Sequence, residues 1–277
     1  MRIAQIWQYP VKSMIGSTVP SAELVPLGIV GDRRWALRDT EAGFIANTRQ
    51  TPGIMQLAAA HAPGGAVSIT LPDGSRVAST DAAVNEVLSG ALGRAILLEV
   101  LRPADDLDFY RSAPLPEGDP MPFIRDLFGR DDGEPIPDFA KFGPNVGVYS
   151  SPPGTFYDCY PLMIMTTSAL RSMAEAVPDS VVDVRRFRPS LLIDTGDEPG
   201  HPEFGWTGRR FAIGDAVVEV INDCPRCAAI TKQVTTEIPQ DRAILRHVVR
   251  DLGQAVGMYA TVVRSGTIHE NDPLLPA

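Results

Sequence analysis

The chain has 277 residues, 44% of them hydrophobic, and its formal net charge is −9. This composition allows a sizeable buried core, and the acidic balance argues against general binding to a nucleic-acid backbone, which needs a basic face. No apolar run approaches the ~20 residues of a membrane span, and the first residues lack the basic-then-apolar layout of a signal peptide. We therefore expect a cytoplasmic protein with no nucleic-acid or membrane partner.

The first hundred residues predict a β-rich unit. Residues 34–38 (RWALR) alternate apolar and polar side chains, which is typical of a half-buried strand. Residues 67–78 predict two strands joined by the turn PDGS, and residues 96–101 predict a further strand. Between them, Asp81 is placed to cap a short helix, because apolar side chains recur at helical spacing after it, at Val84, Val87, Leu88 and Leu92.

Residues 103–153 differ in composition from the rest of the chain. Proline, glycine and acidic residues crowd this segment, as in PLPEGDPMPF and GRDDGEPIPDF. We expect a long crossing or lid segment with little regular structure, since such segments in compact proteins are usually functional or disordered. The predicted division is therefore an N-terminal domain at 1–102, a crossing segment at 103–153 and a C-terminal domain at 154–277.

The C-terminal part predicts more strands and a few helices. Apolar runs at residues 162–165, 191–193 and 216–221 are typical of buried strands, and residues 259–264 predict the last strand. Side chains at helical spacing predict helices from about residue 168 and over 241–252. Many short strands with few helices favour a barrel-like α+β fold that is mainly β.

Two of the three cysteines lie in the stretch INDCPRCAAIT, residues 221–231. An odd, small number of cysteines argues against a disulfide framework. A zinc site lacks a second close pair of ligands, and a thioredoxin-like redox pair should open a helix, whereas strand or loop follows Cys227. The spacing alone leaves open a single metal-binding or nucleophilic thiolate and, equally, two small buried hydrophobic side chains.

Basic residues near these cysteines and at the ends of predicted elements favour a charged site. The guanidinium of Arg226 beside Cys227 favours a thiolate, which suits a metal held by soft sulfur ligands. Several cations together can form a pocket for an anion, although each one alone is more typical of a solvated surface charge. The basic residues in question are Lys12, Arg33, Arg34, Arg49, Arg186 and Arg188.

Short motifs occur in a fixed order along nearly the whole chain. They are YPVKS (9–13), GDRRW (31–35), NTRQ (47–50), FYDCYPLMIMTTSAL (156–170), RRFRPSLLID (185–194), FGW (204–206), GRRFAIGDAVVEV (208–220), CPRCAAIT (224–231) and VRSGTIHENDP (263–273). On these motifs the chain resembles the MOSC (molybdenum cofactor sulfurase C-terminal) domain family with its N-terminal β-barrel domain, a group that includes the mitochondrial amidoxime-reducing components and bacterial relatives. The match is weakest between residues 102 and 153. The resemblance implies an N-terminal β-barrel domain followed by a MOSC β-barrel with peripheral helices.

The resemblance also implies a set of site residues. Cys227 is expected to ligate molybdenum, and Asp158 to bond the pterin ring and act with Cys227 in catalysis. Ser190 stands where the family often has Asn, and Cys159 where it often has a hydroxyl residue. The segment AAITKQVTTEIPQD (228–241) replaces the family's usual continuation after the cysteine. The full expected cofactor-binding set is Lys12, Ser13, Arg33, Asp158, Cys159, Arg188, Ser190, Arg226 and Cys227.

The implied function is a molybdenum-dependent oxidoreductase that reduces a small N-oxygenated (N-hydroxylated) substrate. The implied cofactor is Mo-molybdopterin, with no pyridoxal phosphate. Electrons are expected from a separate donor of the ferredoxin, flavoprotein or cytochrome type. The first alternative is a sulfur carrier or sulfurtransferase that holds a persulfide on Cys227 or Cys159. The second is a cofactor-binding carrier without catalysis.

Overall fold

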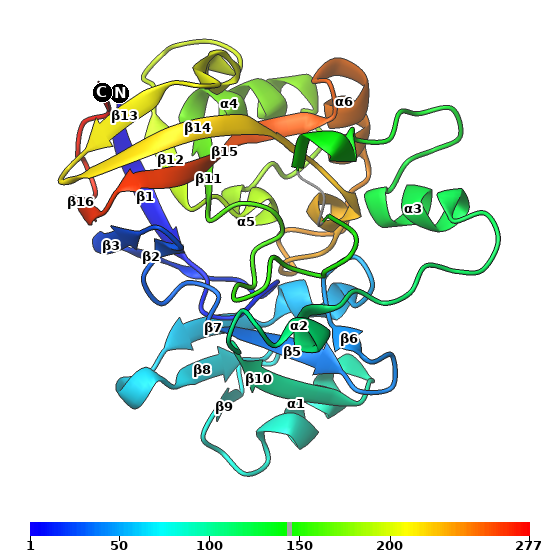
Figure 1. Ribbon diagram of the computed structural model, residues 1–277. Coiled ribbons are helices and arrows are strands. Elements are labelled where there is room, and N and C mark those ends of the chain that lie inside the picture. Colours follow the sequence, from blue (N-terminus) through cyan, green and yellow to red (C-terminus); the bar gives the residue numbers. More distant parts are fainter. Residues whose placement is uncertain (143–145) are drawn as a thin grey trace.

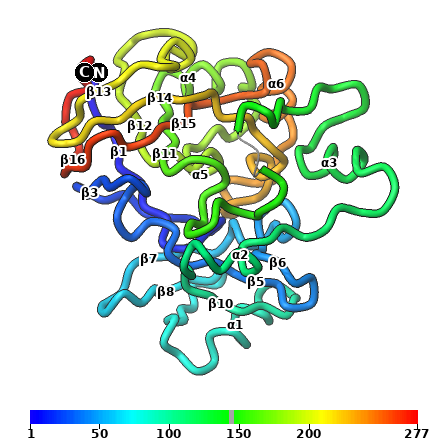
Figure 2. Tube along the Cα trace, viewed as in Figure 1, coloured from blue at the N-terminus to red at the C-terminus, as the bar shows by residue number. Residues whose placement is uncertain are grey.

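The structure is a computed structural model that describes residues 1–142 and 146–277. Figure 1 shows two lobes, a larger one with a long sheet and most of the helices, and a smaller one with short strands. The tube in Figure 2 shows that the chain starts in the larger lobe, crosses to the smaller one and returns, so that the two termini lie side by side. The amide of Leu274 donates to the carbonyl oxygen of Met1 at 3.1 Å.

An eight-stranded sheet forms the frame of the larger lobe, in the order β17-β13-β14-β15-β11-β12-β1-β2. Its neighbouring strands are antiparallel except β11 and β12, which are parallel and joined through helices, as a parallel connection requires. The strands are β1 (Arg2–Gln8), β2 (Ser17–Val19), β11 (Leu162–Thr166), β12 (Leu191–Asp194), β13 (Arg210–Ile213), β14 (Ala216–Pro225), β15 (Ala255–Arg264) and β17 (Leu275–Pro276).

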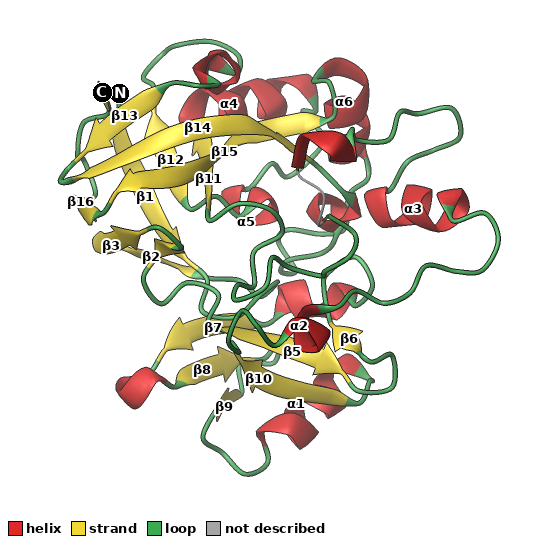
Figure 3. Cartoon of the chain, viewed as in Figure 1, coloured by secondary structure: helices red, strands yellow, loops and turns green. Residues whose placement is uncertain are grey.

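Helices cover one side of this sheet (Figure 3). Buried side chains of α4 (Thr167–Ala176) and α6 (Ala243–Asp251) share a core with β11, β12 and β15. The short α5 (Val184–Phe187) lies in the connection to β12. The 3-10 turns η4 (Pro202–Trp206) and η5 (Ala228–Thr231) follow β12 and β14. The predicted helices from about residue 168 and over 241–252 are therefore confirmed with small differences at their ends.

A three-stranded sheet joins both ends of the chain. It has the order β16-β3-β4, from β3 (Ser21–Val25), β4 (Gly28–Ile29) and β16 (Gly266–His269). Its apolar residues Leu24, Ile29 and Ile268 belong to the same core as the inner strands of the large sheet. The first thirty residues thus contribute strands to the lobe built mainly by the C-terminal part.

The smaller lobe holds two further three-stranded sheets around a separate core. Helix α1 (Val84–Leu92) and β10 (Ile96–Val100) confirm the predicted elements there, as do the strands of the hairpin at 67–78. Asp81 does not cap α1: its carboxylate accepts from the amide of Ala78 at 2.7 Å. The other elements are β5 (Trp35–Asp39), β6 (Phe44–Ile45), η1 (Pro52–Gln56), β7 (Ala58–His61), η2 (Pro63–Gly65), β8 (Val67–Thr70) and β9 (Arg76–Ala78).

The crossing segment contains more regular structure than the sequence predicts. It carries α2 (Leu107–Tyr110), α3 (Met121–Phe128) and η3 (Phe139–Phe142). Helix α3 has a proline in its first turn and ends at Gly129, whose φ of 62° is left-handed. Asp131 then forms ion pairs with Arg242 at 2.7 Å and Arg246 at 2.8 Å. These contacts fix the end of α3 against α6.

The mainly β, α+β class is confirmed. In the described ranges the four sheets are open, since no recorded pairing joins the outer strands of any one of them. Isolated bridges between Val11 and Trp35 and between Ile15 and Ala58 link the loop after β1 to the smaller lobe. Over the same ranges, no helix combines the length and the apolar character needed to cross a bilayer.

Candidate functional site

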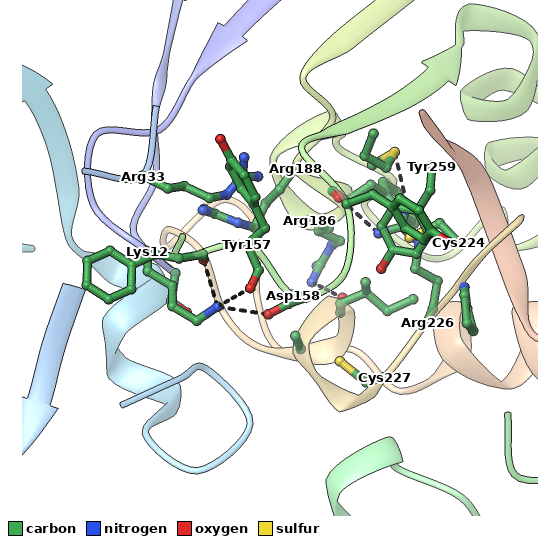
Figure 4. A pocket seen from close by; sticks show the side chains of 18 residues that line it. Lys12, Arg33, Tyr157, Asp158, Arg186, Arg188, Cys224, Arg226, Cys227 and Tyr259 are labelled. Carbon is green, nitrogen blue, oxygen red and sulfur yellow. Dashed lines mark hydrogen bonds and ion pairs between the residues drawn. The ribbon is translucent and has the colours of Figure 1, made fainter. Parts of the chain in front are cut away.

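A pocket lies where the loop after β1, the loop before β11 and the end of β14 meet. It holds about 760 Å³ of space between its lining atoms, including the part that opens to solvent. Five cationic side chains and one carboxylate line it. In Figure 4, Lys12, Arg33 and Arg188 lie toward one side and Cys227 toward the other, with Asp158 between them. An acidic protein thus concentrates positive charge in one hollow.

Three residues that line the pocket have left-handed backbones. They are Ser13 (φ 69°), Arg33 (φ 47°) and Arg188 (φ 58°). A residue with a Cβ pays about 1 kcal/mol or more for this conformation. Such strain persists where the surrounding structure imposes it, and it is concentrated at functional sites. The pocket is therefore held in shape against local backbone preference.

Tyr9 organises the arginine side of the pocket. Its ring lies 5.2 Å from Arg33 Cζ and 4.3 Å from Arg188 Cζ. Its hydroxyl donates to the carbonyl oxygen of Pro189 at 2.9 Å, and its amide donates to Asp32 Oδ1 at 2.6 Å. Asp32 also accepts from Arg33, and Arg188 donates to the carbonyl oxygen of Met14. Two guanidinium groups are thus fixed around one aromatic ring.

The charges of these two arginines are maintained in the fold. Burial lowers the pKa of the Arg188 guanidinium to about 10, with the charge of Arg33 adding to the effect. Burial also lowers the pKa of Arg33, but the Asp32 carboxylate outweighs it and raises that pKa overall. Both side chains are therefore protonated at neutral pH, and they share one buried carboxylate. This arrangement favours an anion such as a phosphate, which forked guanidinium groups bind well.

Lys12 is buried and holds the loop at 156–158. Its Nζ donates to the carbonyl oxygen of Phe156 at 2.9 Å, to Asp158 Oδ1 at 2.9 Å and to Ser151 Oγ at 3.2 Å. Burial lowers the pKa of Lys12, while the Asp158 charge opposes this. An ammonium has three protons to donate, so an added phosphate would have to replace one of these acceptors. The predicted phosphate contact of Lys12 stays a prediction.

Asp158 faces the pocket. The side chain is 66% exposed, and the positive charge of Lys12 holds its carboxyl pKa well below the usual range, although burial acts in the opposite direction. The group is thus an anion at neutral pH and acts as a hydrogen-bond acceptor. This is compatible with the predicted bond to a pterin ring.

The three cysteines differ in their surroundings, and all three are free thiols. Cys227 is half-buried and lines the pocket. Cys224 also lines the pocket, but it is 3% exposed and belongs to the core under α6; burial raises the pKa of its thiol. Burial also raises the pKa of Cys159 to about 12, and this residue does not line the pocket. Cys227 is therefore the thiol best placed to reach a ligand.

Two other predicted site residues have structural contacts instead. The Arg226 guanidinium donates to the carbonyl oxygens of Val256 at 2.9 Å and Phe187 at 3.0 Å. It fixes the cysteine loop to β15 and α5, and its charge lowers the pKa of Cys224 against the effect of burial. Ser190 is 1% exposed, and its hydroxyl accepts from the amide of Met163 at 3.3 Å. Ser190 does not line the pocket.

Arg49 is one of the basic residues that the sequence groups as a candidate anion site, but it is not in the expected cofactor-binding set and does not line the pocket. Burial lowers the pKa of its guanidinium, but nearby negative charges, first those of Cys227 and Asp158, outweigh burial and raise it. The signal in the sequence was the basic residue of the motif NTRQ at the end of a predicted strand. Aromatic residues of the site, Tyr9, Tyr157 and Tyr259, also lacked a sequence signal beyond ordinary packing.

The donor set of the pocket fits a molybdenum cofactor. Within residues 1–142 and 146–277, no three His, Cys, Asp or Glu side chains gather in a way that could hold a metal ion. A metal at Cys227 would therefore take its other ligands from a group that is not part of the protein. A phosphorylated organic group with sulfur donors matches one thiol at one side and two arginines at the other.

Comparison with family models agrees with the motifs. A model described as the MOSC domain matches residues 151–275, and one described as the MOSC N-terminal beta barrel domain matches residues 1–92. The chain belongs to the MOSC family. The division of this MOSC protein at residues 102 and 153 stays a prediction.

Curated relatives cover almost the whole MOSC chain at low identity. The "Mitochondrial amidoxime reducing component 2" of Macaca fascicularis is 22% identical over 98% of this chain and 82% of the relative. The protein of the same name from Bos taurus is also 22% identical, with the same coverage.

Solved structures give weaker matches. The YUAD protein from Bacillus subtilis aligns over 98% of this chain and 92% of its own, with 11% identity and a TM-score of 0.42. YiiM from Geobacillus stearothermophilus aligns over 43% of this chain and 54% of its own, with 17% identity and a TM-score of 0.32.

Proposed function

We propose that this MOSC protein is a molybdenum-cofactor-dependent oxidoreductase that reduces small N-oxygenated substrates. The observation that carries the proposal is a single accessible thiol, Cys227, in a hollow lined by cations and built from both parts of the chain. Membership of the MOSC family and the name of the curated relatives, amidoxime reducing component, support the same chemistry.

Each side chain has a defined task in this proposal. Cys227 would supply the protein's sulfur ligand, and Arg33, Arg188 and Ser13 would bind the phosphate of the pterin. Lys12 would hold the loop at 156–158 and so present Asp158 to the pterin ring and to protons moving at the site. The cofactor, when bound, supplies the two-electron redox chemistry, while the protein orients it.

The overall reaction is R–NH–OH + 2e⁻ + 2H⁺ → R–NH₂ + H₂O, or the equivalent for a related N–O bond. The electrons would come from a separate redox protein of the ferredoxin, flavoprotein or cytochrome type. The sequence has three cysteines, fewer than the four thiolate ligands of a common iron–sulfur cluster.

The test uses protein purified from a host that makes the cofactor. We expect about one molybdenum per chain by elemental analysis, and reduction of benzamidoxime when a reduced viologen dye supplies electrons. Cys227→Ala should lose both, whereas Cys224→Ala, which alters a buried thiol in the same segment, should keep both. A Cys227→Ala protein with full molybdenum and full reduction would rule the proposal out.

A second candidate is a sulfur carrier with a persulfide on Cys227, since this thiol is accessible. The raised pKa of Cys159 and its place outside the pocket make that residue the weaker carrier. Mass spectrometry under non-reducing conditions separates the candidates. A mass increase of one sulfur on Cys227, consumed on addition of a thiol acceptor in pterin-free protein, would favour the carrier.

A further inference from the structure

We propose that Arg49 is a substrate-binding residue that donates hydrogen bonds to the negatively polarised oxygen of the substrate beside Cys227. This inference rests on the proposed function and names the part of the substrate that the site recognises. The substrate class would be small molecules with an oxygen bound to nitrogen, such as amidoximes, hydroxamic acids and N-oxides.

The backbone at Arg49 is fixed by its neighbour Asn47. The Asn47 Oδ1 atom accepts from the amide of Arg49 at 3.0 Å and from the amide of Gln50 at 3.3 Å. It also accepts from Arg49 Nε at 3.4 Å. An Asx turn of this kind orients both the chain and the base of the side chain. Arg49 therefore leaves the smaller lobe in a defined direction.

Packing brings Arg49 to the cysteine loop. Its Cζ lies 6.0 Å from the centre of the Phe128 ring, at the end of α3. The next residue, Gly129, approaches the residue after Cys227 so closely that a Cβ there would lie 3.3 Å from Ala228 Cβ. Phe128 and Gly129 thus connect Arg49 to the loop that carries Cys227.

The charges of two pocket residues act on Arg49. The two largest contributions of charge to its pKa come from Cys227 and Asp158. In return, the charge of Arg49 helps to lower the pKa of Lys12 and that of Asp158. Arg49 thus lies within range of the charges of Cys227, Asp158 and Lys12, although it is not among the residues that line the pocket.

The other arginines near Cys227 are engaged by the protein itself. Arg130 donates to the carbonyl oxygens of Phe128, Pro135 and Arg226 at 2.6 to 3.1 Å. Arg226 is bound to β15 and α5 as described above. In contrast, the two terminal nitrogens of Arg49 have no hydrogen-bond partner among the residues that the structure describes. They form a planar fork that is well suited to an oxygen with partial or full negative charge.

Alkylation of Cys227 in cofactor-free protein tests the position of this charge. Iodoacetate is an anion and iodoacetamide is neutral, and both form a thioether with the thiolate while iodide leaves. If Arg49 lies beside Cys227, its charge attracts the anionic reagent. Arg49→Met should then lower the ratio of the iodoacetate rate to the iodoacetamide rate on the order of fivefold. Arg49→Lys should keep most of the ratio, and Arg76→Met, at an exposed arginine of β9, should leave it unchanged. Peptide mapping assigns the label to Cys227.

Kinetics of the loaded enzyme test substrate binding. Arg49→Met should hold as much molybdenum as the parent and raise the KM for benzamidoxime on the order of tenfold, which is the loss of about one charged hydrogen bond. Equal alkylation ratios and an equal KM in Arg49→Met would overturn the inference. If the parent protein held no molybdenum and reduced nothing, the proposed function would fail, while the alkylation ratio would still decide whether Arg49 stands beside Cys227.

Discussion

The guanidinium of Arg188 lies over the ring of Tyr9, with 4.3 Å between Cζ and the ring centre, and Arg33 approaches the same ring to 5.2 Å. The ring faces two like charges and stabilises both through its quadrupole. The two arginines share one buried carboxylate, Asp32, so that a net positive charge remains to bind an anionic ligand. The predicted phosphate site thus depends on an aromatic residue that does not itself bind phosphate.

Replacement of Tyr9 should weaken anion binding. Tyr9→Leu removes the ring and should raise the Kd for inorganic pyrophosphate about tenfold, since a buried cation–π contact contributes about 1–2 kcal/mol. Tyr9→Phe keeps the ring and loses the hydroxyl bond to Pro189, so its Kd should stay near that of the parent. Isothermal titration of cofactor-free proteins, at a temperature where circular dichroism shows all three folded, gives the values. Equal Kd values for Tyr9→Leu and the parent would show that the ring does not position the arginines.

Replacement of Ser13 by glycine should raise the stability of the protein and weaken its binding of the cofactor. Ser13→Gly relieves the left-handed backbone and should raise the free energy of unfolding by up to about 1 kcal/mol. The same change removes the hydroxyl and should lower molybdenum retention after dialysis. Ser13→Ala keeps the Cβ and loses the hydroxyl, so it should lower retention without the gain in stability. Urea unfolding and metal analysis measure both quantities, and a Ser13→Gly protein less stable than Ser13→Ala would contradict the strain argument.

The ion pair of Lys12 and Asp158 should make the stability of the fold depend on pH in the acid range. The folded pKa of Asp158 lies below its unfolded value of about 3.9, so the unfolded state binds the proton first. The stabilisation is present above about pH 4 and is lost as pH falls toward the depressed folded pKa. Asp158→Asn should therefore show a smaller fall in Tm than the parent between pH 5 and pH 2.

The matched control for this experiment is Glu175→Gln. Glu175 is exposed and forms no ion pair within the described ranges, so this variant should follow the parent. Asp158→Asn should also be less stable than the parent at pH 7, because the buried ammonium loses its charged partner. A fall in Tm as steep in Asp158→Asn as in the parent would show that the pair contributes nothing to acid unfolding.

Cys224 should prove dispensable for the metal. Cys224→Ser places a hydroxyl among apolar neighbours, so the free energy of unfolding should fall by about 1–3 kcal/mol. Molybdenum content should remain that of the parent, because Cys224 is only 3% exposed at the wall of the pocket, whereas Cys227 is the accessible thiol. Denaturant unfolding and elemental analysis check the two statements. Loss of metal from a folded Cys224→Ser protein would show that Cys224 and Cys227 are both metal ligands.

The sequence predicted best what depends on local pattern. The period of apolar residues gave α1, α6 and most inner strands, because a helix or strand buries one face at a fixed spacing. Of the basic residues at the ends of elements, Lys12, Arg33, Arg186 and Arg188 line one hollow, whereas Arg34 and Arg49 do not. Helix α3 was missed because the prolines and acidic residues around it outweighed its own pattern, even though Pro122 and Gly129 stand where helices begin and end.

Orientation of side chains could not be predicted from the sequence. Arg226 is next to Cys227 in the chain, but its guanidinium donates to carbonyl oxygens of β15 and α5. Arg49 is far from Cys227 in the chain, and the two segments are connected through Phe128, which lies near the Arg49 guanidinium, and Gly129, which lies against Ala228. Lys12 acquires four protein acceptors, three of which lie in the loop at 156–158.

The pairing of β1 with β12 has a consequence for how the protein can be divided. Residues 2–8 form part of the sheet whose other central strands lie beyond residue 160. A fragment that starts at residue 154 would leave β12 with a free edge, and exposed edges of this kind invite association between chains. Experiments that aim to separate the two parts should therefore use a circular permutant or co-express the segments, since the neighbouring termini permit a short linker.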